Sequence, residues 1–110
     1  MRLLLGVSGG IAAYKALDLT SLALKAGHEV RVIMTESATQ FVGPLSFEGL
    51  CGTPPMVGRG HLASGAAMNH IQWAKWADIC CVAPLTAHTL ARMALGLADD
   101  ALSTVALALP

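Results

Sequence analysis

Charged residues are scarce in this chain, and aromatic residues are scarcer still. Of its 110 residues, 13% are charged and 5% are aromatic, whereas 55% are hydrophobic. The seven basic and seven acidic residues cancel, so the chain lacks the basic surface typical of nucleic-acid-binding proteins. A small domain cannot bury so much apolar surface alone, because its surface is large relative to its volume. We therefore expect one domain, residues 1–110, that self-associates.

The chain also lacks a hydrophobic run long enough to span a membrane. The uncharged stretch 79–91 contains Pro84 and His88 and falls short of the roughly 18 residues that a spanning helix needs. The apolar start MRLLLGV is too brief for the core of a signal peptide, and a Ser-Gly-Gly sequence interrupts it. We expect a cytoplasmic protein with no membrane partner.

Cysteine is too rare to form a disulfide framework. Cys51, Cys80 and Cys81 form no CxxC pair and leave an odd count, which also argues against a zinc site. If 79–83 is a strand, the adjacent Cys80 and Cys81 point to opposite faces of the sheet, as packing thiols would. His61 and His70 have no carboxylate or cysteine at a metal-ligand spacing, so no metal is expected.

What the chain does contain is an alternation of apolar strands and amphipathic helices. This pattern predicts an α/β, Rossmann-like fold, in which a parallel sheet with three strands in this chain is flanked by helices. Strands are expected at 2–7, 29–35 and 79–83, and helices at 10–25, at 86–95 and, capped by Asp99 or Asp100, up to 107. Short helices broken at Pro44 are expected over 41–52, and a loop over 52–67.

The first strand runs through a glycine turn, GVSGGIAAYK, directly into a helix. The free N–H groups and the dipole of a helix N-terminus attract phosphate, while Gly9 and Gly10 let the backbone approach it and Ser8 offers a hydroxyl donor. An ordinary strand-to-helix turn is the alternative. A dinucleotide GxGxxG fingerprint fails here, because Ser8 and Ile11 stand where glycine is required.

The other strands also end in polar residues. Thr35 and Ser37 follow the second strand, whereas Pro84 halts the third and Thr86 is placed to cap the next helix. Each residue taken singly is more often just a cap. Together they predict a hydroxyl-bearing rim beside the glycine turn, because the carboxyl ends of parallel strands meet at one edge of the sheet.

Several segments, in order, resemble the N-terminal part of the flavin-dependent cysteine decarboxylases, particularly the bacterial phosphopantothenoylcysteine decarboxylases. They are GVSGGIAAYK, VRVIMTESATQF, PLSFEGL and AAMNHIQWAKWADICCVAPLTAHTLARMALGLADDALST. The resemblance implies a flavoprotein that binds FMN at trimer interfaces and acts in coenzyme A biosynthesis. Its members oxidise a cysteine through the flavin, release carbon dioxide and form an enethiol, which the phosphopantothenoylcysteine enzymes reduce to phosphopantetheine. The residues implied to line the flavin are Ser8, Gly9, Gly10, Ile11, Thr35, Ser37, Pro84 and Thr86.

His70, expected in a loop, matches the active-site histidine of this family. A lone loop histidine is most often structural or solvated, but imidazole titrates near physiological pH and suits the proton handling that a flavin reaction needs. His28, His61 and His88 lack such a motif context. His70 is therefore the candidate catalytic residue.

The chain also departs from the family. The family's domain continues past residue 110 with an Asn-containing segment that holds the substrate carboxylate and with a cysteine for the reductive half-reaction. We therefore expect a truncated chain or a split gene product that does not complete turnover alone. Two other classes stay open: a non-catalytic flavin-binding or regulatory homologue, and a nicotinamide-dependent oxidoreductase fragment. The broken dinucleotide fingerprint disfavours the second.

Overall fold

A four-stranded parallel sheet forms the centre of the molecule. The computed structural model describes residues 1–58 and 67–109, with side chains described for 1–58 and 71–109. The strands are β1 (Arg2–Val7), β2 (Glu29–Met34), β3 (Met56–Val57) and β4 (Ile79–Val82), in the order β3-β2-β1-β4. Every neighbouring pair is parallel, which confirms the predicted parallel α/β fold.

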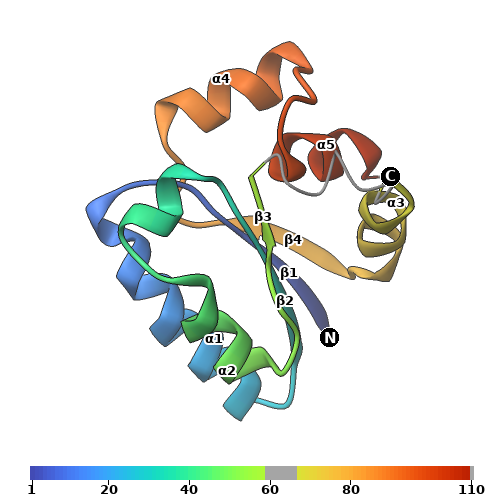
Figure 1. The fold of residues 1–110 in the computed structure, drawn as a ribbon. Coiled ribbons are helices and arrows are strands. Elements are labelled where there is room, and N and C mark those ends of the chain that lie inside the picture. Colours follow the sequence, from blue (N-terminus) through green and yellow to red (C-terminus); the bar gives the residue numbers. More distant parts are fainter. Residues whose placement is uncertain (59–66, 110) are drawn as a thin grey trace.

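Helices cover both faces of this sheet (Figure 1). A 3-10 helix, η1 (Ile11–Tyr14), leads into α1 (Lys15–Lys25), and η2 (Ser37–Gln40) precedes α2 (Pro44–Cys51). α1 and α2 lie on one face, whereas α3 (Ala67–Trp76) and α5 (Ala101–Ala108) lie on the other; α4 (Ala87–Leu95) stands beyond the carboxyl ends of the strands. Because they are parallel, the three longer strands, β1, β2 and β4, all end at the same edge of the sheet.

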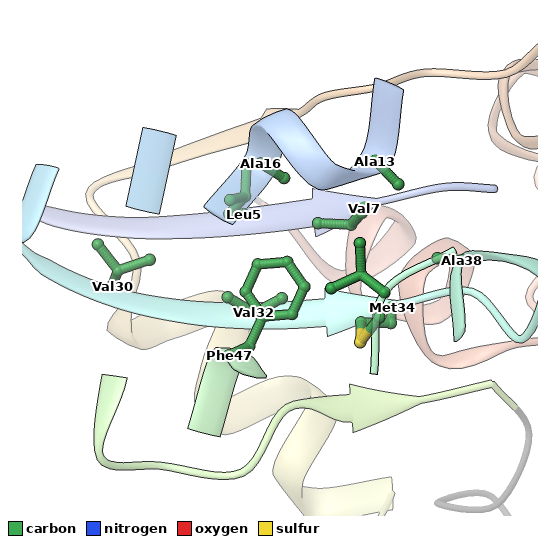
Figure 2. Close-up of a cluster of buried hydrophobic side chains, with 10 residues drawn as sticks. Leu5, Val7, Ala13, Ala16, Val30, Val32, Met34, Ala38 and Phe47 are labelled. Atoms are coloured by element: carbon green, nitrogen blue, oxygen red, sulfur yellow. The ribbon is translucent and has the colours of Figure 1, made fainter. Parts of the chain in front are cut away.

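Alternating strand residues build two separate cores, because successive side chains of a strand point to opposite faces. Leu5 and Val32 belong to the cluster that packs against α1 and α2, and Phe47 of α2 covers it (Figure 2). Leu4 and Ile33 belong to the cluster that packs against α3 and α5. We call these the first face and the second face of the sheet.

Three expectations from the sequence are wrong. The expected loop 52–67 contains β3, a strand too short to show an alternating pattern. Pro44 begins α2 rather than breaking a helix, since its missing N–H has no partner in a first turn anyway. His70 lies within α3 rather than in a loop, because Ala, Met, Gln and Lys in 67–76 favour a helix and no Gly or Pro interrupts it.

The cysteines behave as packing residues. Cys81 packs against the first face and Cys80 against the second, as the strand alternation predicts. Burial raises the pKa of the Cys51 thiol, and burial together with the neighbouring Cys81 raises the pKa of the Cys80 thiol. Both shifts disfavour the thiolate, which is the reactive form.

Residues 1–58 and 67–109 include no helix with the length and apolarity that a membrane crossing requires. In the same ranges, no three His, Cys, Asp or Glu side chains gather into a group suited to hold a metal ion.

Candidate functional site

The polar residues that follow the strands do meet at one edge of the sheet. Backbone hydrogen bonds fix this arrangement: Thr35 N–H donates to the Val7 carbonyl at 3.0 Å, and Ser8 N–H donates to the Pro84 carbonyl at 3.2 Å. Residues that lie far apart in the sequence are thereby held in register just beyond the sheet.

Ser8 joins two of these strand ends through its side chain. Its buried hydroxyl donates to the Pro84 carbonyl and accepts a hydrogen bond of 2.9 Å from Thr86 N–H. The hydroxyl hydrogen therefore already has an acceptor within the protein. Ser8 therefore positions the turn before α4. The sequence predicts instead that its hydroxyl donates to a ligand, and this hydrogen bond to Pro84 uses that proton.

The two glycines of the turn have different surroundings. A Cβ atom added at Gly9 would lie 2.4 Å from Ser37 Cβ and 2.9 Å from the Ser37 carbonyl carbon, so the close approach of η2 already requires glycine there. Gly10 is extended, with φ −177°, and a Cβ atom there would meet nothing within 4 Å. Ile11, the next residue, is 81% exposed. The open backbone of this turn is thus at Gly10 and Ile11.

A cavity of about 260 Å³ lies at this edge, and we call it the hydroxyl cleft. Its lining residues are Gly9, Thr35, Ser37, Thr86, His88, Thr89 and Arg92. Four of the predicted site residues therefore meet in one cavity. Pro84 instead lines an apolar hollow beside α1, formed with Ala12, Lys15, Ala16, Leu19 and Ala83.

Sequence reasoning missed the part of the cleft that α4 provides. Thr86 caps this helix by accepting from Thr89 N–H at 3.3 Å, which stabilises its first turn. His88 and Arg92 are four residues apart and hence share one side of the helix. That spacing, directly after a capping residue at a strand end, is the signal in the sequence that could identify both residues, although His88 has no surrounding motif.

Arg92 also ties the cleft to α5. Its guanidinium donates to Asp100 Oδ2 at 2.9 Å, and its Nε lies 3.7 Å from Asp99 Oδ1. Asp100 is buried and forms a capping box with Ser103 at the start of α5. The two carboxylates partly offset the positive charge that Arg92 brings to the cleft.

A second cavity, of about 400 Å³, adjoins the first. Thr35, Ser37 and Arg92 border both cavities, and Glu36 and Asp100 add carboxylates to the second. The edge of the sheet therefore offers two adjoining cavities: the hydroxyl cleft, which Arg92 makes cationic, and a second cavity, in which Glu36 and Asp100 accompany Arg92. A phosphate group matches the first cavity better, because hydroxyl groups and the Arg92 guanidinium line it and no carboxylate of the described residues does.

The backbone of His70 belongs to α3, on the second face, while its side chain lies outside the described residues. Its predicted catalytic role is not tested by the geometry of the cleft.

Comparisons with known proteins identify relatives along the entire chain. A family model described as Flavoprotein matches residues 1–110. The coenzyme A biosynthesis bifunctional protein CoaBC of Vibrio vulnificus (strain YJ016) is 47% identical over 107 residues, which cover 97% of this chain and 27% of that protein. CoaBC of Escherichia coli (strain K12) is 47% identical over 109 residues, which cover 99% of this chain and 27% of that protein. The chain thus spans 27% of the length of these curated relatives.

Solved structures with the same fold include two decarboxylases. The FMN-dependent cysteine decarboxylase SpaF has a TM-score of 0.84 and 36% identity, over 100% of this chain and 63% of that one. A cysteine-to-serine mutant of PPC decarboxylase, complexed with pantothenoylaminoethenethiol, has a TM-score of 0.78 and 31% identity. The match covers 98% of this chain and 60% of that one. Both structures extend beyond the part that this chain matches.

Proposed function

This chain belongs to the Flavoprotein family, and from that premise we propose that it binds FMN as the N-terminal part of a phosphopantothenoylcysteine decarboxylase. The observation that carries the proposal is the hydroxyl cleft, where Gly9, Thr35, Ser37 and Thr86 converge from three separate strand ends. The relatives supply the class of ligand and reaction, because they include CoaBC proteins of coenzyme A biosynthesis and FMN-dependent cysteine decarboxylases.

The residues of the cleft, together with the adjoining Gly10–Ile11 turn, fit the phosphate end of FMN. The first N–H groups of η1 have no acceptor within the helix, and the space beside Gly10 leaves room for a phosphate to approach them. Thr35, Ser37 and Thr86 add hydroxyl groups, and Arg92 adds a guanidinium. In this proposal these residues hold the cofactor, while Ser8 and Pro84 keep the turn in place.

The chemistry proposed for the complete protein is oxidative decarboxylation of a terminal cysteine. Bound FMN would supply the two-electron oxidation that precedes loss of carbon dioxide. His70 would handle the proton, accepting it from the substrate or orienting the thiol and the carboxylate. The remainder of the protein, which the curated relatives contain, would complete the substrate site.

Gly10→Val tests the cofactor site with little disturbance of the fold. The extended backbone at Gly10 accepts any residue and its Cβ position is open, so the variant should fold, yet its side chain should obstruct the phosphate. We expect FMN affinity, measured by titration of flavin fluorescence, to fall at least tenfold. Gly9→Val would be a poorer test, because it would clash with η2 even without a ligand.

Gly43→Val is the matched control for this experiment. Gly43 precedes α2, has an ordinary φ of −72° and also has nothing within 4 Å of its Cβ position. It should retain FMN as the unsubstituted protein does. Equal FMN affinity in both variants would place the phosphate elsewhere, and a protein that never binds FMN would remove the proposed function altogether.

His70→Asn separates binding from chemistry. In the complete protein this variant should retain FMN, since the cleft is untouched, while the release of carbon dioxide from phosphopantothenoylcysteine falls by about 10²-fold or more, the scale of one lost acid–base group. Substantial decarboxylation by His70→Asn would reject the role of this histidine. Flavin binding without turnover, even in the complete protein with His70 intact, would instead favour the regulatory homologue.

We also propose that the protein forms a homotrimer and is located in the cytoplasm. Apolar side chains that are largely exposed border the turn and α4, among them Ile11 and Leu95, and the apolar hollow beside α1 lies close by. Self-association would cover this surface. Light scattering should detect an assembly larger than one chain at micromolar concentration, and a well-folded, monodisperse monomer would contradict this. The cytoplasmic location follows from the proposed metabolic role.

A further inference from the structure

Arg31 has an unusual environment at the opposite end of the sheet from the hydroxyl cleft. It belongs to β2, where Val30 and Val32 point to the first face and Arg31 points to the second. Its guanidinium carbon lies 4.4 Å from the ring centroid of Trp76 and 5.4 Å from that of Trp73. Two indole rings of α3 therefore hold the guanidinium in place by cation–π contact.

No carboxylate pairs with this guanidinium among the residues that the structure describes. All seven acidic residues of the chain fall within those residues, and the salt bridges found there involve Arg2 and Arg92 instead. A partly buried guanidinium without an anion is uncommon, because burial penalises a charge that has no partner. Arg31 is thus fixed in position but electrostatically unpaired.

A cavity of about 230 Å³ opens beside it, and we call this the Arg31 cavity. His28, Cys51, Thr53 and Trp76 line it together with Arg31. The Nδ1 atom of His28 is buried with no hydrogen-bond partner in the described part of the chain. A second polar side chain that lines this cavity therefore also has an atom without a hydrogen-bond partner in the described part of the chain.

We propose that the Arg31 cavity binds a small oxyanion, a carboxylate or phosphate group, through the guanidinium of Arg31. The planar fork of arginine matches two oxygens of such a group, and stacking on the indoles holds the fork ready before the ligand arrives. The volume is below the roughly 300–1,000 Å³ typical of pockets for larger organic ligands, which suits a small anion or the charged end of a metabolite.

The other groups around the cavity permit an anion there. Glu29 is the one acidic residue of the lining, and its Oε2 atom lies 3.6 Å from Arg2 Nε. Both side chains are more than half exposed, so water and Arg2 attenuate the repulsion between Glu29 and a bound anion. Burial raises the pKa of the Cys51 thiol, which therefore adds no negative charge at neutral pH. Thr53 contributes a neutral hydroxyl.

This site is separate from the proposed flavin site. The six residues of β2, Glu29–Met34, lie between His28 and Thr35, and at about 3.3 Å per residue they separate the two ends by roughly 20 Å. The two cavities share no lining residue. Binding at the Arg31 cavity can therefore be measured with or without flavin.

The chain offers a specific probe, because Trp73 and Trp76 are its only tryptophans. Their two indole N–H signals in a ¹H–¹⁵N correlation spectrum report on this cavity and are insensitive to flavin absorbance. Inorganic phosphate and acetate are titrated separately into the FMN-loaded protein, with sodium chloride at equal ionic strength as the reference. We expect saturable shifts of both signals with at least one of the two anions, and the anion that saturates first identifies the preferred head group.

Three variants make the result decisive. Arg31→Gln should weaken anion binding at least tenfold, and Arg31→Lys should weaken it severalfold, since it keeps the charge but loses the planar fork. Lys75→Gln removes an exposed charge of α3 that lies between Trp73 and Trp76 in the sequence, and it should leave the affinity within twofold. Absence of saturable shifts, or equal affinity in Arg31→Lys and the unsubstituted protein, would overturn the proposal. Indole shifts that follow protein dilution without added anion would assign the partner of Arg31 to an acidic group of another copy, which also overturns it.

Discussion

The two faces of the sheet are packed by different means. The first face is an almost purely apolar core, in which Phe47 of α2 fills the centre and small residues, Ala13 and Ala16, let η1 and α1 approach the strands. The second face combines a smaller apolar cluster around Leu102 with polar contacts at both ends, the Arg92–Asp100 pair near the hydroxyl cleft and Arg31 between its two indoles. Packing on the second face fixes the two arginines of the candidate sites, whereas packing on the first face supports the hydroxyl cleft through the backbone of η1 and η2, whose Ala13 and Ala38 belong to its cluster.

Phe47→Ala should produce the largest loss of stability. Phe47 is fully buried, and removal of a buried aromatic side chain costs about 3–5 kcal/mol of unfolding free energy, which urea denaturation would measure. FMN affinity of the folded protein should stay within twofold, because Phe47 lines neither cavity of the cleft. A tenfold loss of FMN affinity with retained fold would show that the two faces are not independent.

Asp100→Asn should reduce the stability of the protein less than Phe47→Ala does, but it should reduce FMN affinity more. Asparagine retains the capping role, so the variant isolates the ion pair with Arg92, and we expect a loss of about 1–2 kcal/mol because Arg92 is partly exposed to solvent. FMN affinity should fall severalfold, since Arg92 would no longer be held against the cleft. Asp18→Asn, an exposed change in α1 on the first face, is the control and should change neither quantity appreciably. Unchanged FMN affinity in Asp100→Asn would remove Arg92 from the proposed site.

The smallest effect concerns the thiols. Burial raises the pKa of Cys51, packed against the first face, and that of Cys80, packed against the second, so both are protonated at pH 8. Iodoacetamide should therefore alkylate both more slowly than it alkylates glutathione, with rates that rise as the pH is raised, because only the thiolate reacts. Mass spectrometry of the digested protein measures each rate. Rapid alkylation of Cys80 alone would show that the second face opens more readily than the first.

Long, strongly patterned elements could be predicted from the sequence. β1 and β4 are apolar runs, β2 alternates charged and β-branched residues in its first half, and α4 and α5 begin after Thr86 and Asp100, residues that cap helices. β3 could not be predicted, because its two residues, Met56 and Val57, form a strand by pairing with Ile33 and Met34, a contact that depends on tertiary structure. α3 was not predicted at all, because the glycine-rich sequence before it indicated a loop that also included His70.

The candidate site was predictable as far as it depends on strand ends. Parallel strands bring their carboxyl ends together whatever the details of packing, and so Thr35, Ser37 and Thr86 could be grouped in advance. The contributions of His88 and Arg92 depend on the direction in which α4 leaves the sheet, and the sequence does not encode that direction locally. The bonding of the Ser8 hydroxyl likewise depends on Pro84 and Thr86, which follow it by more than seventy residues.

The shortness of β3 has a consequence for solubility. Among the described residues, β3 pairs only with the last two residues of β2, so the outer edge of Glu29–Val32 has no neighbouring strand. An open edge invites pairing with another chain and hence aggregation. Here the open half carries charged side chains at Glu29 and Arg31, and the indole of Trp76 lies across the second of them. Charge and bulk at this position protect the molecule against growth of the sheet from one copy into the next.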